Sequence, residues 1–429
     1  MALRHGRVTT GRQYRGWTVI SGVRGAAVRM PCPRPDFRRD RTKGFAMRKR
    51  DRSALRRVAF LIGHLGRGGA EAQISLLAQG LSNRGIEVHM FLISKSGPHE
   101  AVLRDAGIAV HHLGFGRKPS GAPDLVRCLR GYVRLITSLR RIRPDVLHAY
   151  LFEGRMLGAP AARLAGVPVM VAGRRNAGEP EQRHRRVLVL ERAMTRLTDH
   201  VVANAIAVAE EARTIVKIPA RKLTVIYNGL RASAFEQAEP ASIDTELPVV
   251  LCVARLAPQK GHTILLDAAS RLLRRGRPCT FLLAGEGRER HRLEELVREL
   301  GVDVRFLGDR TDVNALLANA DVVVLPSLWE GLSNAVMEAM AAGRPIVATA
   351  IGGTPELLAG RGVLVPVSDA EALADGIVRV LDDPDLAASL GRAARAWARE
   401  HLDVDVMIDQ HVDLYQRLAR IQKDWTSKS

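Results

Sequence analysis

The sequence predicts an α/β protein built from two doubly wound parallel-sheet domains that face each other across a cleft. Three observations support this fold class. Short apolar segments typical of buried strands alternate with helical segments from Arg57 onward. The alternation stops over residues 233–246, which lose the apolar pattern, and then begins again. A chain of 429 residues is long enough for two domains, each with its own core.

In the first half, helices are expected at about 70–83 and 124–141, the second being basic and amphipathic and ended by Pro144. A shorter apolar helix is expected over 187–194. Because strands and helices alternate throughout, right-handed crossovers and a parallel sheet are expected. The expected strands are 58–63, 88–93, 110–113, 145–148, 167–172, 201–203 and 223–227.

The second half repeats the pattern and ends in two helices, at about 384–401 and 404–424. Its expected strands are 249–254, 280–284, 304–307, 322–326, 346–348 and 363–365. The domain division follows from these segments. It comprises an extension (1–50), a first domain (51–232), a linker (233–246), a second domain (247–400) and a final helical segment (401–429).

The most informative stretch runs from Glu330 to Glu338 and reads EGLSNAVME. Glu330 follows a strand at the sheet edge where open α/β proteins bind ligands. Ser333 and Asn334 would bring the free N–H groups of a helix N-terminus to the same place, which suits an anion. Glu338 lies among small apolar residues, so its carboxylate needs a partner or a ligand. The pattern indicates a ligand that is both sugar and phosphate, although a loop charge and an exposed helical Glu remain alternatives.

Cations and glycine turns occupy the same predicted edges. Arg255 follows one strand and Lys260 precedes the next helix, so both could converge on one diphosphate. The turns at Gly68-Gly69 and at Gly285 each follow a strand and would let a phosphate approach the backbone. Plain connecting turns and solvated surface cations are the alternative interpretations.

Polar residues also follow two strands of the first half. His148 ends one expected strand, and Arg174, Arg175 and Asn176 follow the next. These side chains could meet a phosphate or an acceptor, although a lone histidine is more often structural. The basic cluster at 183–186 suits anionic lipid headgroups and a solvated helix end equally well.

The positive charge of the chain is concentrated at its start. Of a net charge of +20, residues 1–50 carry +12, from 14 Lys/Arg against Asp36 and Asp40. This segment lacks periodicity, so we expect a disordered or non-native extension, with Met47 as an alternative start. A tail that touches anionic lipid or nucleic acid, or a targeting segment, remains an alternative. The location of the charge disfavours a specific nucleic-acid-binding groove.

The remaining composition favours a cytoplasmic protein. The four cysteines stand far apart, without zinc or redox spacing, and are expected to be reduced. No uncharged apolar run approaches the roughly 18 residues of a membrane span. No Asp-X-Asp motif is positioned for a metal ion, and no cofactor is expected.

Taken together, these motifs resemble glycosyltransferase family 4, the retaining enzymes with the GT-B fold. The resemblance covers roughly residues 57–420 and is most specific around Arg255 and Lys260 and in 324–349 (VLPSLWEGLSNAVMEAMAAGRPIVAT). It implies transfer of a sugar from a UDP- or GDP-sugar to a hydroxyl of a lipid-linked or cell-surface saccharide. It also implies that the last helix crosses back to the first domain. A lipid-linked acceptor would place the protein on the inner face of the plasma membrane.

The resemblance implies a role for each matching residue. The expected catalytic residues are His148, Arg255, Lys260 and Glu330. The expected donor-binding residues are Gly68, Gly69, Arg255, Lys260, Gly285, Ser333, Asn334, Ala335 and Glu338, and Arg174 and Asn176 are assigned to acceptor or phosphate. The implied mechanism is front-face displacement, in which the departing phosphate accepts the proton of the incoming hydroxyl. The sequence departs from the family at Tyr150, where many members have a second histidine, which affects the sugar contacts.

Three alternative functions remain at this point. A nucleotide-sugar epimerase would share the fold but needs acid and base residues in the cleft that show no obvious pattern here. A nucleic-acid-binding protein would fit the charge, and a non-catalytic sugar-binding relative would fit the fold. The four residues Arg255, Lys260, Glu330 and Glu338 argue against the last of these.

Overall fold

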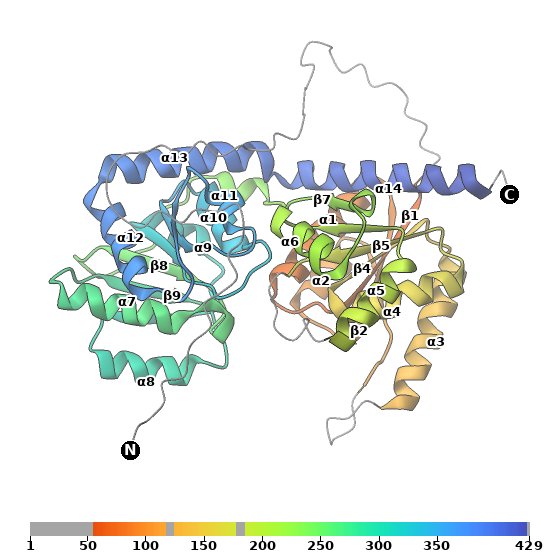
Figure 1. The fold of residues 1–429 in the computed structure, drawn as a ribbon, viewed down its shortest axis with the longest axis horizontal. Coiled ribbons are helices and arrows are strands. Elements are labelled where there is room, and N and C mark those ends of the chain that lie inside the picture. The colour runs from red at the N-terminus through yellow and green to blue at the C-terminus, as the bar shows by residue number, and fades with distance from the viewer. Residues whose placement is uncertain (1–54, 117–123, 177–184, 427–429) are drawn as a thin grey trace, which may run out of the picture. The chain divides into compact units, whose positions relative to one another are not determined.

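The computed structural model describes residues 55–116, 124–176 and 185–426 (Figure 1). Residues 51–429 form one compact unit, and the following description concerns that unit alone. The extension 1–50, including Met47, and residues 183–184 of the basic cluster lie outside the described residues.

The first domain contains a parallel sheet with the strand order β3-β2-β1-β4-β5-β6-β7. The order reverses between β1 and β4, which is where a doubly wound sheet opens a crevice at the carboxyl ends of its strands. The strands are β1 (Arg57–His64), β2 (Glu87–Lys95), β3 (Ala109–His112), β4 (Val146–Tyr150), β5 (Val169–Arg174), β6 (His200–Ala203) and β7 (Leu223–Val225).

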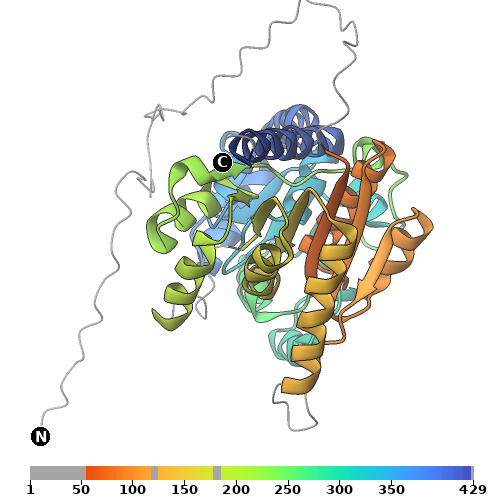
Figure 2. The same cartoon turned by 90° about the vertical axis from the view of Figure 1, so that its right-hand side faces the viewer.

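Helices cover both faces of this sheet because side chains alternate along each strand. In β1, Val58, Phe60 and Ile62 join the core beneath α1, α2 and α14, whereas Ala59 and Leu61 join the core beneath α3 and α4. Figure 2 shows α14 and α3 on opposite sides of the strands. The helices are α1 (Gly69–Asn83), α2 (Pro98–Asp105), α3 (Leu125–Ile142), α4 (Leu151–Ala165), α5 (Arg185–Arg196), α6 (Ile206–Glu211) and α14 (Val404–Thr426).

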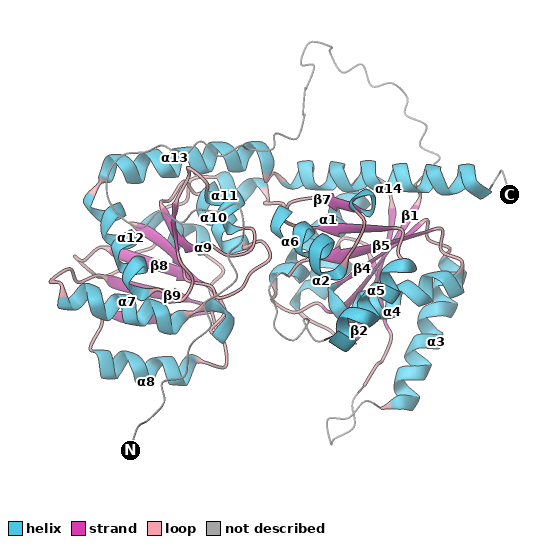
Figure 3. Ribbon diagram, viewed as in Figure 1, coloured by secondary structure: helices cyan, strands magenta, loops and turns pink. Residues whose placement is uncertain are grey.

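The second domain repeats this architecture around a parallel sheet with the order β10-β9-β8-β11-β12-β13 (Figure 3). Its order reverses between β8 and β11. The strands are β8 (Val249–Val253), β9 (Thr280–Ala284), β10 (Val304–Gly308), β11 (Val322–Leu325), β12 (Ile346–Thr349) and β13 (Val363–Val365). The helices are α7 (His262–Arg274), α8 (Arg290–Leu300), α9 (Val313–Asn319), α10 (Asn334–Ala341), α11 (Thr354–Leu358), α12 (Ala370–Asp382) and α13 (Pro384–His401).

The chain passes between the domains twice, and the two passages are hydrogen-bonded to each other. Leu230 N–H donates to the Leu402 carbonyl at 2.7 Å, and Val404 N–H donates to the Leu230 carbonyl at 2.9 Å. After the second passage, α14 packs on α1, where a Cβ on Gly80 would lie 2.1 Å from Ile408 Cδ1. The expected return of the last helix to the first domain is therefore confirmed.

The sequence placed each strand within a few residues of its observed position. The consequential difference concerns β4, which was expected to end at His148 but continues to Tyr150. No glycine or proline marks that boundary, and α4 follows β4 directly. The position of His148 therefore differs from the expected one.

Candidate active site

The site lies at the reversal point of the second sheet. Arg255 follows β8, Glu330 follows β11, and α10 begins four residues after Glu330. Because β8 and β11 are adjacent and parallel, the loops after them lie at one edge of the sheet. The structure thus brings together the two segments that the sequence analysis singled out.

Lys260 and Glu330 form a direct ion pair. Lys260 Nζ donates to Glu330 Oε1, and Ser327 Oγ donates to the same oxygen at 3.1 Å. The two residues were expected to have separate tasks, one at the diphosphate and one at the sugar. In the structure the buried Glu330 is 8 % exposed and neutralises Lys260. Each side chain therefore holds the other in place at the mouth of the site.

Arg255 is the uncompensated cation of this edge. Its side chain is exposed, and it has no hydrogen-bond or ion-pair partner in the described part of the chain. The Gly285 turn packs beside it, since a Cβ on Gly285 would lie 2.2 Å from the Ala254 carbonyl oxygen. Gly285 has φ of 143°, which only glycine adopts readily. Its close approach is therefore to the backbone next to Arg255.

The N-terminus of α10 points at the same edge. Ser333 caps the helix, and its Oγ accepts a hydrogen bond from Val336 N–H at 3.4 Å. This cap leaves the N–H groups of Asn334 and Ala335 without an acceptor among the described residues. Free N–H groups and the helix dipole together make a seat for an anion.

Glu338 lies one turn into α10. The residue as a whole is partly exposed, and the protein atoms packed around its carboxyl reduce its hydration and raise its pKa to about 7. Its carboxylate has no hydrogen-bond partner among the residues that the structure describes. A ligand with paired hydroxyl groups would supply the missing donors.

The turn between β1 and α1 contacts α10 from the first domain. Asn334 Nδ2 donates to the Gly69 carbonyl at 3.4 Å, and a Cβ on Gly69 would lie 3.2 Å from that nitrogen. A Cβ on Gly68 would lie 2.1 Å from Glu71 Oε2, a buried carboxylate that folds beneath the turn. Gly69 therefore faces the second domain, while Gly68 makes room for Glu71.

A cavity of about 290 Å³ opens in the first domain at the carboxyl ends of β1, β4 and β5. Leu151 has φ of 60° at the junction of β4 and α4, a strained conformation of the kind that collects at functional sites. The cavity is lined by Gly63, His64, Leu151, Phe152, Glu153, Arg155, Gly173, Arg174, Arg175 and Asn176.

One buried carboxylate, Glu191, pairs with two of the three arginines that line this cavity. Glu191 Oε1 lies 2.7 Å from Arg155 Nη1 and 2.6 Å from Arg174 Nη1. Glu191 is 2 % exposed, and sequence reasoning missed it. Its only sequence signal is a carboxylate within an otherwise apolar stretch of α5. Arg174 is thus ion-paired at the cavity wall, and Asn176 lies beside it.

The expectation that His148 lies at a strand tip beside the sugar was wrong. His148 is the third residue of β4, is fully buried, and faces α14 rather than the cleft. Its Nδ1 lies 2.6 Å from the Tyr415 hydroxyl, and burial lowers the pKa of its imidazole well below the ordinary value. His148 therefore joins the sheet to α14, and we remove it from the catalytic set.

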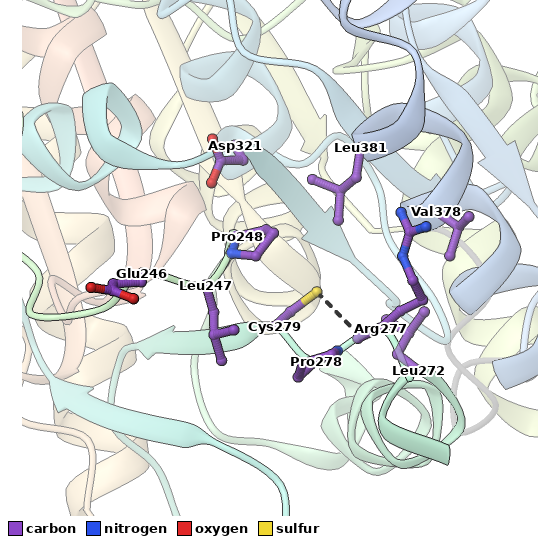
Figure 4. A pocket seen from close by; sticks show the side chains of 10 residues that line it. All are labelled: Glu246, Leu247, Pro248, Leu272, Arg277, Pro278, Cys279, Asp321, Val378 and Leu381. Atoms are coloured by element: carbon purple, nitrogen blue, oxygen red, sulfur yellow. Dashed lines mark hydrogen bonds between the residues drawn. The ribbon is translucent and has the colours of Figure 1, made fainter. Parts of the chain in front are cut away.

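A larger cavity, of about 360 Å³, lies at the opposite end of the second sheet (Figure 4). Pro248, Cys279 and Asp321 line it, and each of them directly precedes a strand. Because ligands of open α/β sheets bind at the carboxyl ends of strands, we do not assign this cavity to the site.

A metal-binding cluster and a membrane-spanning helix are both absent from the described residues. These residues contain no group of three or more His, Cys, Asp and Glu side chains arranged to hold a metal ion. They also contain no helix that combines the length and the apolar character needed to cross a membrane.

Both domains of the chain are similar to those of known glycosyltransferases. A family model described as "Glycosyl transferases group 1" matches residues 247–383, and one described as "Glycosyl transferase 4-like domain" matches residues 68–229. A D-inositol 3-phosphate glycosyltransferase of Arthrobacter is 30 % identical over 83 % of this chain and 97 % of its own length. LpsE of Rhizobium meliloti, a lipopolysaccharide core biosynthesis glycosyltransferase, is 28 % identical over 82 % and 97 %.

A solved structure shows the same fold. HepE of Anabaena, crystallised in complex with UDP, is 24 % identical, with a TM-score of 0.71. The alignment covers 83 % of this chain and 99 % of HepE.

Proposed function

Since the chain belongs to glycosyltransferase family 4, the group 1 glycosyl transferases with the GT-B fold, we propose that it is a retaining enzyme that uses a UDP-sugar. A GDP-sugar is the alternative donor. The observation that supports this proposal most directly is the convergence of Arg255, the Lys260–Glu330 pair and the N-terminus of α10. The acceptor is a hydroxyl of a saccharide carried by a lipid or by the cell surface.

The donor is bound through three chemically distinct parts, which are the diphosphate, the ribose and the transferred sugar. Arg255, the N–H groups at the start of α10 and the Gly69 turn receive the diphosphate, because they are the unpaired positive groups of the site. Glu338 accepts hydrogen bonds from the ribose hydroxyls, which compensates its burial. Glu330 contacts the transferred sugar. The complex of the related HepE with UDP supports a uridine donor.

The reaction proceeds by displacement on one face of the sugar. The bond from the anomeric carbon to the diphosphate oxygen breaks, and the acceptor oxygen forms its bond on the same face, so the configuration is retained. The departing phosphate oxygen takes the proton of the acceptor hydroxyl. Arg255 and Lys260 stabilise the negative charge that develops on the diphosphate. These groups supply the charge that a metal ion supplies elsewhere, and we expect EDTA to leave the rate unchanged.

The acceptor binds in the first-domain cavity, which opens toward the carboxyl ends of β1 and β4. Its lining combines apolar Leu151 and Phe152 with Glu153 and three arginines, two of which pair with Glu191. Arg175, which has no carboxylate partner among the described residues, would attract an anionic group on the saccharide. The name of LpsE, a lipopolysaccharide core enzyme, supports a cell-envelope acceptor.

An exposed face of α3 supports a lipid-linked acceptor. Four large apolar side chains of its first half are at least half exposed and fall within about 100° of the helix surface: Leu125, Val126, Leu129 and Val133. Six arginines and no acidic residue occupy positions 125–144: Arg127, Arg130, Arg134, Arg140, Arg141 and Arg143. Figures 1 and 2 show the beginning of α3 extending away from the sheet. An apolar stripe beside arginines suits an anionic bilayer surface.

Sedimentation with vesicles tests this surface separately from catalysis. The protein should sediment with phosphatidylglycerol-containing vesicles, less so in high salt, and not with phosphatidylcholine alone. Leu125→Glu with Leu129→Glu should abolish sedimentation, whereas Leu273→Glu, at an exposed apolar position of α7, should not. Equal binding by all variants would contradict the assignment. Dimerisation lost in the double variant would assign the stripe to a second copy instead.

A thermal-shift screen with UDP, GDP and ADP tests the donor assignment. UDP should raise the unfolding temperature, and Glu338→Gln should reduce that shift, because the amide offers the ribose hydroxyls one neutral acceptor oxygen in place of two carboxylate oxygens. The expected product is then measured as UDP released from UDP-sugars with lipopolysaccharide-core acceptors. Epimerised donor formed without acceptor would favour an epimerase, and the absence of a shift with all three nucleotides would refute the proposal.

A further inference from the structure

A chain of side-chain hydrogen bonds connects the first-domain cavity to the start of α10. Arg175, which lines the cavity, donates through Nη1 to Asn228 Oδ1. Asn228 Nδ2 donates to Asn334 Oδ1 at 2.7 Å. Asn334 Nδ2 in turn donates to the Gly69 carbonyl at 3.4 Å. The chain therefore ends where the two domains present the backbone groups assigned to the donor diphosphate.

Arg175 and the Gly69 carbonyl fix the direction of these hydrogen bonds from the two ends of the chain. A guanidinium can only donate, so the carbonyl oxygen of the Asn228 amide must face Arg175. The Asn228 amide nitrogen is then directed at Asn334, which has to present its oxygen there. The remaining Asn334 nitrogen faces the Gly69 carbonyl. Without the guanidinium, the Asn228 oxygen would lose its donor, and the Gly69 carbonyl alone would orient the two amides.

The surroundings of Arg175 show that its placement is tightly constrained. The residue is 8 % exposed, its Nη2 donates to the Tyr150 hydroxyl at 3.2 Å, and its guanidinium lies 4.9 Å from the Tyr150 ring centroid. None of its partners in the described part of the chain is a carboxylate. A buried charge without a counterion is costly, so a neutral residue would favour stability at this position.

The backbone of Arg175 is equally constrained from the second domain. A Cβ on Gly331 would lie 1.8 Å from the Arg175 carbonyl oxygen, so only glycine allows this approach. Gly331 directly follows Glu330 of the ion pair with Lys260. Arg175 therefore contacts the second domain directly through its backbone and indirectly through its side chain, by way of Asn228.

We propose that Arg175 is a positioning residue that acts through Asn228 and Asn334 to hold the start of α10 against the Gly69 turn. The arrangement of these two backbone segments, rather than a contact of Arg175 with the nucleotide, is what favours binding of the donor diphosphate. The inference rests on the proposed function, because it concerns the same donor site.

A double-mutant cycle, measured on UDP affinity, tests whether Arg175 and Asn334 act through one chain of hydrogen bonds. UDP binding is measured by calorimetry for the wild type, Arg175→Ala, Asn334→Ala and the double variant. Each single variant should weaken binding about 10-fold, because each breaks the same chain by removing at least one of its hydrogen bonds. Because both act through one chain, the double variant should lose about 10-fold as well. A loss of about 100-fold in the double variant, or no loss in either single variant, would overturn the inference.

Three further variants separate positioning from charge and from folding. Arg175→Lys keeps the charge but cannot reach Tyr150 and Asn228 together, so it should not restore affinity. Restored affinity would show that charge alone matters. Asn334→Asp keeps an acceptor for Asn228 but has no donor for Gly69 and adds a negative charge beside the diphosphate, so it should bind UDP no better than Asn334→Ala. Asn314→Ala, which loses a bond to the Ser233 carbonyl away from the site, should bind UDP normally.

Folding and function failures remain distinguishable. Thermal unfolding is recorded for each variant. If Arg175→Ala does not fold, Asn228→Ala replaces it in the double-mutant cycle with Asn334→Ala. A wild type that binds no nucleotide refutes the proposed function, and the inference with it. A wild type that binds UDP while the variants bind equally well refutes the inference alone.

Discussion

Replacing Glu338 by glutamine should remove a pH dependence from the stability of the ligand-free protein. Burial raises the pKa of the Glu338 carboxyl from 4.5 to about 7. Between these values the folded state keeps a proton that the unfolded state has released. The stabilisation from that proton is therefore fully present below pH 4.5 and is lost as the pH rises through 7.

The size of the effect follows from the two pKa values. At about 1.4 kcal/mol for each pH unit that separates them, ionising Glu338 costs the folded state about 3 kcal/mol. Because the residue is partly exposed, this is an upper value. For a domain of this size, about 3 kcal/mol corresponds to roughly 6–12 °C in unfolding temperature.

The assay is thermal unfolding of wild type and Glu338→Gln from about pH 5 to about pH 9. The wild type should lose several degrees relative to the variant as the pH rises. The comparison cancels buried histidines such as His262 and His411, whose lowered pKa values act in both proteins. Saturating UDP should abolish the difference, because ribose hydroxyls compensate the ionised carboxylate. Identical pH profiles for the two ligand-free proteins would refute the reasoning.

Three substitutions separate catalysis, binding and folding. Lys260→Ala should lower kcat by roughly 10²–10³-fold, measured as UDP release, because a preorganised charge at the leaving group is lost. It should also lower the unfolding temperature by leaving Glu330 buried without its cation, and near-full activity would refute its role. Arg255→Ala should weaken UDP binding in calorimetry without changing the unfolding temperature, since its side chain is exposed and unpaired among the described residues. His148→Phe should lower the unfolding temperature, because the Tyr415 hydroxyl loses its partner, while kcat stays near the wild-type value. A large loss of kcat at wild-type stability would return His148 to the active site.

The fold was predictable because its signals are local. Each strand is a short and nearly continuous apolar run, so β1 or β8 is visible without any knowledge of its neighbours. The convergence of Arg255 and Glu330 was also predictable, because the carboxyl ends of adjacent parallel strands share one edge.

Contacts between distant residues were not predictable in the same way. His148 bonds to Tyr415, 267 residues later, and nothing near His148 in the sequence indicates that partner. Lys260 and Glu330 were expected at one edge, but their direct pairing depends on side-chain placement across 70 residues. Glu191 resembles an ordinary helical carboxylate until the fold brings two arginines to it.

The paired passages between the domains limit how the enzyme can open. Leu230 is bonded through its N–H to Leu402 and through its carbonyl to Val404, so the two passages form one short ladder. Sliding one domain along the other would break both bonds, whereas rotation about the ladder preserves them. We therefore expect opening to be a rotation about this ladder, which would separate Gly69 from Asn334. In the open position of this rotation the donor would enter, and in the closed position water would be excluded. Leu230→Pro would remove the N–H that bonds to Leu402 and so weaken the axis.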